Sequence, residues 1–140
     1  MSKVLCLLLT LLMFPIMSNS TDKINLEDHI KLFSWDKRII LLITKEKYRQ
    51  LINETDDFLE RNKCKNEERN LKYIRIVGDD LNKYVIPERY VNKYGIWLIG
   101  YDGEDKSYSS DTSLLEEIHN IIDSMAIRKI EMTAESEKCN

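Results

Sequence analysis

Cysteine and histidine are the side chains best suited to covalent or acid–base chemistry, and this chain has few of either. Its 140 residues include three cysteines and two histidines: Cys6, Cys64, Cys139, His29 and His119. Their spacing matches neither a Cys-x-x-Cys pair nor a metal site. Spacing places no serine or cysteine nucleophile beside a histidine, so we interpret both histidines as structural or surface residues. We therefore expect either one working thiol or a disulfide, with no metal and no cofactor.

The first 20 residues have the layout of a secretory signal. Lys3 supplies a positive charge, an apolar run of 14 residues follows it, and small polar residues end the segment. The run is shorter than the roughly 20 residues that cross a bilayer as a helix, so a retained anchor is the weaker interpretation. Small residues around Ser20 suit cleavage directly after it. We expect residues 1–20 to be removed, and Cys6 with them.

The rest of the chain is predicted to be one exported domain. No repeat or linker divides residues 21–132, and residues 133–140 form a polar tail. We expect this mature chain to be secreted or periplasmic, without a stable membrane span once the signal is cleaved. Disulfides persist in such oxidising compartments, and Cys64 and Cys139 are the cysteines that remain.

Composition excludes several classes of function. With 43% hydrophobic and 32% charged residues, the chain is an ordinary globular protein. The formal net charge is -3, so a nucleic acid would require a local basic patch, and the sequence has none. Neither Trp35 nor Trp97 is accompanied by the basic cluster that a base-stacking platform needs, and we interpret both as core-facing. We expect no nucleic-acid partner.

Hydrophobic periodicity predicts alternating strands and helices. The expected elements are strand 39–43, helix 45–63, strand 71–77, short helix 87–94, strands 96–99 and 106–109 around an Asp-Gly turn, and helix 113–132. Ser113 and Glu116 match a capping box for the last helix. Strand–helix–strand units pair in parallel, whereas a hairpin is antiparallel. The order β-α-β-α-β-β-α therefore predicts an α/β three-layer sandwich with a mixed four-stranded sheet, the minimal thioredoxin-like fold.

The loops at one edge of this sheet form a candidate binding rim. Open α/β sheets usually bind ligands beyond the carboxyl ends of their parallel strands. The residues expected to converge there are Lys45, Tyr48, Asp79, Asp80 and Gly95. Only topology marks them, so a rim of ordinary polar loops is the competing interpretation.

Three strings elsewhere in the chain resemble one protein family. They are residues 33–38 (FSWDKR), residues 100–103 (GYDG) followed by Lys106, and residues 122–132 (IDSMAIRKIEM). Together they are similar to the domain-of-unknown-function family 4174, over about Leu26 to Met132. The matching positions are Trp35, Arg38, Gly100, Asp102, Gly103, Asp123, Met125, Arg128, Glu131 and Met132. Tyr101 stands where a lysine is common, and Ala126 stands where many members have proline.

The resemblance implies a thioredoxin-like or peroxiredoxin-like domain in an exported protein. Such domains occur in small exported bacterial proteins and in animal matrix proteins that contain sushi repeats. The family has no settled activity, so it gives no catalytic residues to carry over.

We interpret Arg128 of the last string as a residue that stabilises the fold through an ion pair rather than as a binding residue. Its expected partner is Glu131 at i+3, or Asp36 or Asp102 across the fold. Asp123 is five positions away, which is not the spacing of a helical ion pair.

Two absences disfavour thiol catalysis. Thioredoxin-like oxidoreductases place the reactive cysteine directly after the first core strand, at a helix amino terminus that lowers the thiol pKa. Residues 44–48 (TKEKY) occupy that place here. Such enzymes also have a cis-proline before the third strand, where this chain has Tyr94 and Gly95. Catalysis by Cys64 from an unusual position remains the enzymatic alternative.

The predicted fold gives the two cysteines a structural explanation. Its first and last helices pack on the same face of the sheet, so Cys64 and Cys139 reach the same lower rim. A disulfide there closes a loop of about 75 residues and contributes about 4 to 5 kcal/mol in the chain-entropy model. An unpaired thiol with a loose tail is the competing interpretation, because two cysteines carry no spacing signal.

Two further patterns have ordinary explanations. Asp102, Glu104 and Asp105 lack the spacing of a calcium loop and are interpreted as charges of a hairpin turn. Asn53 begins a glycosylation acceptor pattern, but it falls inside the expected helix 45–63.

The sequence thus predicts an exported α/β domain that acts as a non-catalytic binding module for an unidentified extracytoplasmic protein or ligand. The alternative is a thiol-dependent oxidoreductase or peroxidase that uses Cys64.

Overall fold

The computed structural model describes residues 21–136, 138 and 139, and the predicted signal lies outside the described residues. In chain order the elements are β1 (Ile24–Asn25), α1 (Leu26–Lys31), β2 (Arg38–Thr44), α2 (Arg49–Arg61), α3 (Lys63–Glu68), β3 (Leu71–Val77), the 3-10 helix η1 (Gly78–Lys83), β4 (Tyr84–Val85), the 3-10 helix η2 (Glu88–Tyr90), β5 (Gly95–Ile99), β6 (Asp105–Ser109), α4 (Ser113–Asp123) and α5 (Ala126–Ala134). Within the described residues, no helix combines the length and the apolar character needed to cross a membrane.

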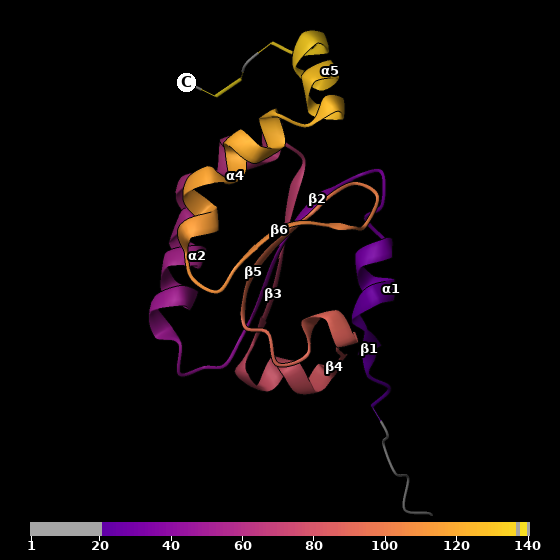
Figure 1. The fold of residues 1–140 in the computed structure, drawn as a ribbon, viewed down its shortest axis with the longest axis vertical. Helices are drawn as coiled ribbons and strands as arrows, with labels where there is room; N and C mark the ends of the chain where they lie inside the picture. Colours follow the sequence, from indigo (N-terminus) through magenta and orange to yellow (C-terminus); the bar gives the residue numbers. More distant parts are fainter. Residues whose placement is uncertain (1–20, 137, 140) are drawn as a thin grey trace, which may run out of the picture.

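Four strands form one mixed sheet in the order β3-β2-β5-β6 (Figure 1). β2 pairs in parallel with β3, and β5 runs antiparallel to both β2 and β6. All seven residues of β2 are buried, which explains why residues 39–43 are continuously apolar instead of alternating. The predicted α/β fold with a mixed four-stranded sheet is confirmed.

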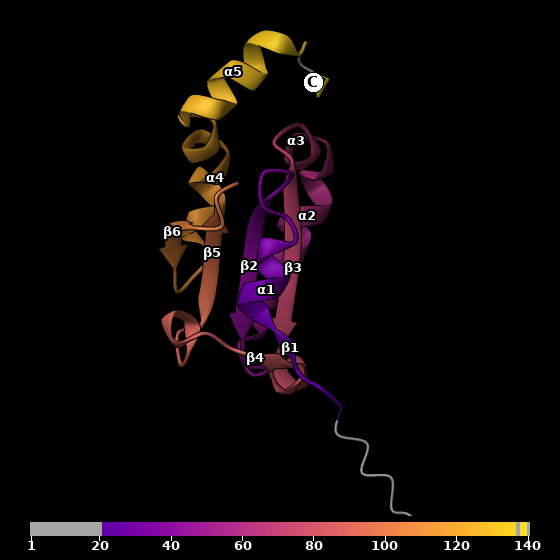
Figure 2. The same cartoon turned by 90° about the vertical axis from the view of Figure 1, so that its right-hand side faces the viewer.

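Helices cover both faces of this sheet (Figures 1 and 2). Side chains alternate along a strand, so Ile40 and Leu42 of β2 pack with α2 and α4, whereas Ile39 and Leu41 pack with α1. The two long helices α2 and α4 therefore share one face, as the sequence predicted. The segments that follow them, α3 and α5, come to the same end of the molecule.

The predicted helix 45–63 is wrong at both ends. The chain makes a turn before α2, and Asn62 separates α2 from α3, which contains Cys64. The Asn62 side chain donates to the Phe58 carbonyl at 3.0 Å. The main-chain N–H of Asn62 donates to the same carbonyl at 3.0 Å, so Phe58 O accepts two hydrogen bonds at the end of α2.

Short elements account for two further differences. The expected helix 87–94 is only η2, because Val91 already has extended dihedral angles, φ −62° and ψ 129°. β1 pairs with β4 and leads into α1, where Asn25 Oδ1 accepts from the Asp28 N–H at 3.2 Å. These elements were not expected, because such short segments carry too little periodicity to be recognised.

The predicted helix 113–132 is broken into α4 and α5. Met125 has extended dihedral angles, φ −69° and ψ 141°, and α5 takes a new direction beyond the end of the sheet (Figure 2). The capping-box prediction is also wrong. Thr112 is the N-cap, and the Ser113 N–H donates to Asp111 Oδ1 at 2.9 Å.

A disulfide joins Cys64 in α3 to Cys139, 75 residues later, as the sequence predicted. The main-chain N–H groups of Lys138 and Cys139 donate to Glu68 Oε1 at 2.6 and 2.8 Å. The hydrogen bond from Lys138 is the main reason that the pKa of Glu68 lies below its ordinary value. The segment after α5 is thus fixed to α3 by a covalent bond and by a charged acceptor.

Gly95→Ala tests the close contact between β5 and β6. Gly95 has φ 153°, and a Cβ at this position would overlap the Ser109 carbonyl oxygen. We expect the free energy of unfolding to fall by about 2 to 5 kcal/mol, from backbone strain and steric overlap. Gly103→Ala is the control, because its φ is 79° but the nearest atom is Ser34 Oγ at 3.7 Å. The free energy of unfolding of Gly103→Ala should fall by only about 1 kcal/mol. Equal losses for the two variants in urea unfolding would contradict the prediction.

Candidate functional site

Arg38 is a charged side chain inside the protein, at the start of the central strand β2. It is 1% exposed. Its Nη1 donates to Arg69 O, Tyr101 Oη and Glu131 Oε2 at 3.0, 3.0 and 3.1 Å, and its Nη2 donates to Glu131 Oε1 at 3.5 Å. The guanidinium carbon lies 4.0 Å from the centre of the Tyr101 ring. Because an unpaired buried charge is strongly destabilising, this arrangement requires α5 to hold Glu131 against β2.

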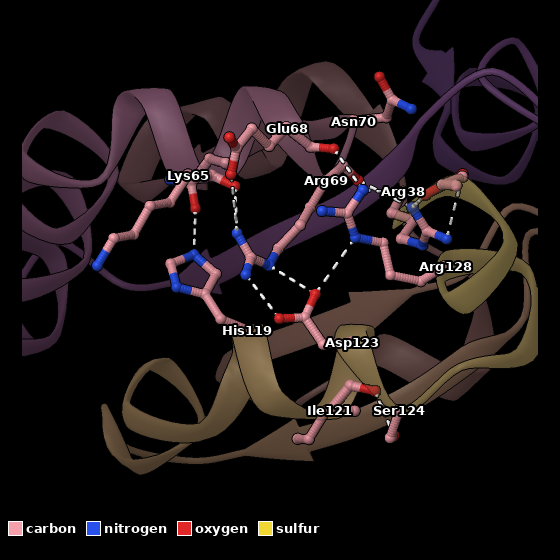
Figure 3. A network of polar contacts seen from close by, with 12 residues as sticks. Arg38, Lys65, Glu68, Arg69, Asn70, His119, Ile121, Asp123, Ser124 and Arg128 are labelled. Atoms are coloured by element: carbon pink, nitrogen blue, oxygen red, sulfur yellow. Dashed lines mark hydrogen bonds and ion pairs between the residues drawn. The ribbon is translucent and has the colours of Figure 1, made fainter. Parts of the chain in front are cut away.

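Two more arginines extend this network across the end of the sheet (Figure 3). Asp123 lies between them and accepts from Arg69 Nη2 at 2.6 Å and from Arg128 Nε at 3.3 Å. Arg128 also donates to the Glu68 carbonyl at 2.8 Å and to Glu131 Oε2 at 3.5 Å. The contact with Glu131 agrees with the sequence analysis. The contact with Asp123 was not expected, and it forms because the chain turns between α4 and α5.

The arginines keep the carboxylates of the network charged. Burial by itself raises the pKa of Glu131, but hydrogen bonds from Tyr101 and Arg38 outweigh it, and the pKa lies below its ordinary value. The pKa of Asp123 is lowered in the same way, with two arginines as donors. Burial, followed by the hydrogen bond to Glu131, raises the pKa of Tyr101. None of these three groups therefore titrates near neutral pH.

His119 has the contacts of a structural histidine. Its Nε2 lies 2.7 Å from Asn66 Oδ1, and its ring packs against Phe58 with centroids 5.5 Å apart. Burial, with a smaller contribution from Arg69, lowers the pKa of His119 to about 4. The imidazole is therefore neutral at physiological pH.

A cavity of about 350 Å³ opens beside Arg38. Its walls come from the loop before β2, the β5–β6 hairpin and the junction of α4 with α5: Trp35, Arg38, Gly100, Tyr101, Asp102, Lys106, Met125, Ala126 and Ile127. The lining is mainly apolar and aromatic, with a few charged groups. This combination of size and lining is typical of a small-ligand site.

Trp35 contradicts the prediction that it faces the core. It is 69% exposed, whereas Trp97 is 3% exposed and buried as expected. The backbone of Trp35 has φ 63°, a region that bulky residues rarely adopt. Its main-chain N–H donates to the Tyr101 carbonyl at 2.8 Å, which fixes this conformation. An exposed tryptophan held in a costly conformation beside a cavity is typical of a recognition site.

The structure brings eight of the ten family-motif positions to this cavity or to the polar network beside it. Those that line it are Trp35, Arg38, Gly100, Asp102 and Met125. Those in the adjoining polar network are Asp123, Arg128 and Glu131. Gly103 lies in the β5–β6 turn, where its N–H donates to the Gly100 carbonyl at 3.0 Å. Met132 lies apart from the cavity, beside Glu68 and Arg69.

Asp102 and Lys106 form the polar part of the cavity wall. Lys106 Nζ lies 2.7 Å from Asp102 Oδ2 and 3.7 Å from Glu104 Oε2. A Cβ at Gly100 would lie 2.5 Å from Lys106 Cε, so a side chain there would displace the Lys106 side chain from its present position. Asp102 thus pairs with Lys106 and not with Arg128, one of the partners considered from the sequence.

The predicted binding rim lies at the opposite end of the sheet from this cavity. Its members follow the carboxyl ends of β2 and β3 or begin β5: Lys45, Tyr48, Asp79, Asp80 and Gly95. Tyr94 joins two of them, since its ring lies 6.1 Å from the Tyr48 ring and 5.2 Å from Lys45 Nζ. The structure gathers these residues at one end, and a binding role for them stays a prediction.

Three contributors to the network carry little signal in the sequence: Arg69, Asn70 and Tyr101. Asn70 Nδ2 donates to Tyr101 Oη at 2.9 Å, and Tyr101 Oη donates to Glu131 Oε1 at 2.6 Å. Arg69 and Asn70 end a charged stretch that resembles a solvated helix terminus. Only the place of Tyr101 directly after Gly100, within a family string, pointed toward the site.

A family model described as "Domain of unknown function (DUF4174)" matches residues 29–131. The matched range contains every residue that lines the cavity. No curated protein and no solved structure matches the chain.

Glu131→Gln tests the dependence of the fold on the Arg38 ion pair. The change removes one carboxylate at nearly constant shape and leaves a buried guanidinium without its anionic partner. We expect the free energy of unfolding at pH 7 to fall by about 3 to 5 kcal/mol. Glu135→Gln, at an exposed position just after α5, is the control and should change it by less than about 0.5 kcal/mol. Similar urea-unfolding curves for the two variants would contradict this prediction.

His119 makes the protein sensitive to mild acid. Its pKa is about 4 in the folded state against an ordinary value of 6.5. The unfolded chain therefore binds more protons between these values, and the free energy of unfolding falls as pH is lowered from about 6.5 toward 4. His119→Gln should reduce this slope in urea unfolding measured across that range.

The carboxylates Asp123 and Glu131 affect stability in a separate and lower pH range. The pKa values of both carboxyl groups are lowered on folding. Their contribution to the free energy of unfolding is therefore complete at any pH above their pKa values in the unfolded chain, and it is lost only below about pH 4.5. The same slope in wild type and His119→Gln between pH 6.5 and 4.5 would contradict the role given to His119.

Proposed function

The chain belongs to the family described as "Domain of unknown function (DUF4174)", and from that premise we propose that it is an exported, non-catalytic binding module. Its recognition site is the cavity beside Trp35. The convergence of motif residues from three separate segments on this one cavity is the observation that carries the proposal. The exposed Trp35 supplies a large rigid contact surface, and the arginine network holds the walls in place.

The position of the sulfur atoms supports recognition over catalysis. Cys64 and Cys139 are joined in a disulfide on α3, at the end of the sheet where β2 and β3 begin. With the strand order β3-β2-β5-β6, a thioredoxin-like enzyme would have its reactive cysteine just beyond the last residue of β2. Lys45 and Glu46 stand there in this chain. Cys64 is also not among the residues that line the cavity beside Trp35.

Export is supported by two independent features. Residues 1–20 have the composition of a secretory signal. The disulfide is of a kind that persists in oxidising compartments.

A thiol count separates this proposal from the thiol-enzyme alternative. Denatured mature protein should contain no free thiol before reduction and two after it. Cys64→Ser and Cys139→Ser should each lower the free energy of unfolding by about 3 to 5 kcal/mol, because both open the same loop.

The two serine variants also serve as controls for each other. A thiol enzyme would lose peroxidase or reductase turnover in Cys64→Ser and keep it in Cys139→Ser. A fast-reacting thiol at Cys64 in the untreated protein, together with that asymmetry, would refute the binding-module proposal.

A further inference from the structure

Arg38 has hydrogen-bonding capacity that the fold leaves unused. A guanidinium carries five N–H groups. Those of Nη1 are directed at Arg69 O, Tyr101 Oη and Glu131 Oε2, and Glu131 Oε1 takes one from Nη2. Glu131 therefore occupies the end formed by Nη1 and Nη2. No hydrogen bond from the remaining edge, made of the Nε–H and the second Nη2–H, is formed within the described residues.

This edge belongs to a side chain that forms part of the cavity wall. Arg38 is 1% exposed as a whole, and its Nε is not among the fully buried polar atoms without a partner, so the edge keeps a small contact with the solvent in the cavity. An acceptor bound there is only partly screened by water, which strengthens the hydrogen bonds. The Tyr101 ring stacks on the guanidinium at 4.0 Å, which favours approach in the plane of the guanidinium. Two parallel N–H groups in one plane match the two oxygens of a carboxylate.

The charged groups of the wall are already paired. Glu131 balances Arg38, and Asp102 balances Lys106. The two parallel N–H groups on the free edge of Arg38 therefore select an anion, and an excess of positive charge does not. Lys106 contacts two carboxylates, Asp102 and Glu104, and its ammonium group has a third N–H for the same ligand.

The rest of the wall suits an apolar body. Trp35 offers an exposed ring, Met125 is polarizable and adapts to the shape of a ligand, and Ile127 is 43% exposed. A volume of about 350 Å³ accommodates an aromatic ring or a short alkyl chain, but lies at the small end of ligand cavities.

We propose that this cavity binds an organic carboxylate with an apolar or aromatic body. The carboxylate lies on the free Nε–Nη2 edge of Arg38, and the body lies between Trp35 and Ile127. The inference rests on the proposed function, since it names the ligand chemistry of the same site. A free small acid and the C-terminal residue of a polypeptide both present this chemistry.

The natural tryptophans allow a direct titration of the mature chain. Trp35 is 69% exposed beside the cavity and Trp97 is 3% exposed, so a ligand should shift the emission of Trp35 to the blue. The probes are 3-phenylpropionate, 3-phenylpropanamide, and the peptide Gly-Gly-Phe with a free or an amidated C-terminus. Each acid should bind at least about 10-fold more tightly than its amide.

The four probes also distinguish the two sources of the ligand. Tighter binding of the peptide acid assigns a polypeptide C-terminus, and tighter binding of 3-phenylpropionate assigns a small molecule. Equal binding of acid and amide, or no binding of any probe, overturns the proposal.

Two variants on one exposed helix face locate the site without touching the buried network. Ile127→Asp places a negative charge in the cavity wall and should weaken binding of the acid at least about 10-fold in isothermal titration. Ile130→Asp is the matched control, since Ile130 is 68% exposed on the same helix and does not line the cavity. It should leave the affinity unchanged, and equal weakening by both variants overturns the placement.

The test separates this inference from the function on which it rests. A free reactive thiol at Cys64 would refute the binding-module proposal whatever the probes do. A chain without such a thiol that binds none of the four probes refutes only the carboxylate site.

Discussion

The buried charge of Arg38 is the constraint that organises one whole end of this protein. A guanidinium at the first position of the central strand is stable only if a carboxylate reaches it, and Glu131 of α5 is that carboxylate. The chain must therefore leave the direction of α4 at Met125 and bring α5 over the end of the sheet. The cavity wall at Ala126 and Ile127 follows from this turn.

The sheet was predictable because its strands carry strong local signals. β2 contains five consecutive aliphatic residues, β3 is rich in β-branched and aromatic residues interrupted by Lys72 and Arg75, and the Asp-Gly turn marks the hairpin of β5 and β6. The break between α4 and α5 was not predictable, because neither glycine nor proline interrupts residues 113–132 and the periodicity continues. Tertiary ion pairs, and not local preference, decide the conformation there.

The candidate site was harder to predict than the fold, because its residues come from distant segments. Family resemblance marked Trp35, Arg38 and Glu131 without giving them a role, and topology pointed to the rim at the other end of the sheet. Trp35 was placed in the core on residue type alone. Its exposure depends on a positive φ and on one hydrogen bond to the Tyr101 carbonyl, neither of which has a sequence signature.

The distances along the chain within the arginine network also affect the lifetime of the folded state. Arg38 and Glu131 are 93 residues apart in sequence, and contacts of such separation consolidate late because the intervening chain must first be ordered. Interactions absent from the folding transition state act mainly on the rate of unfolding. We therefore expect the ionic cluster to slow the unfolding of the molecule while contributing little to the rate at which the chain first folds.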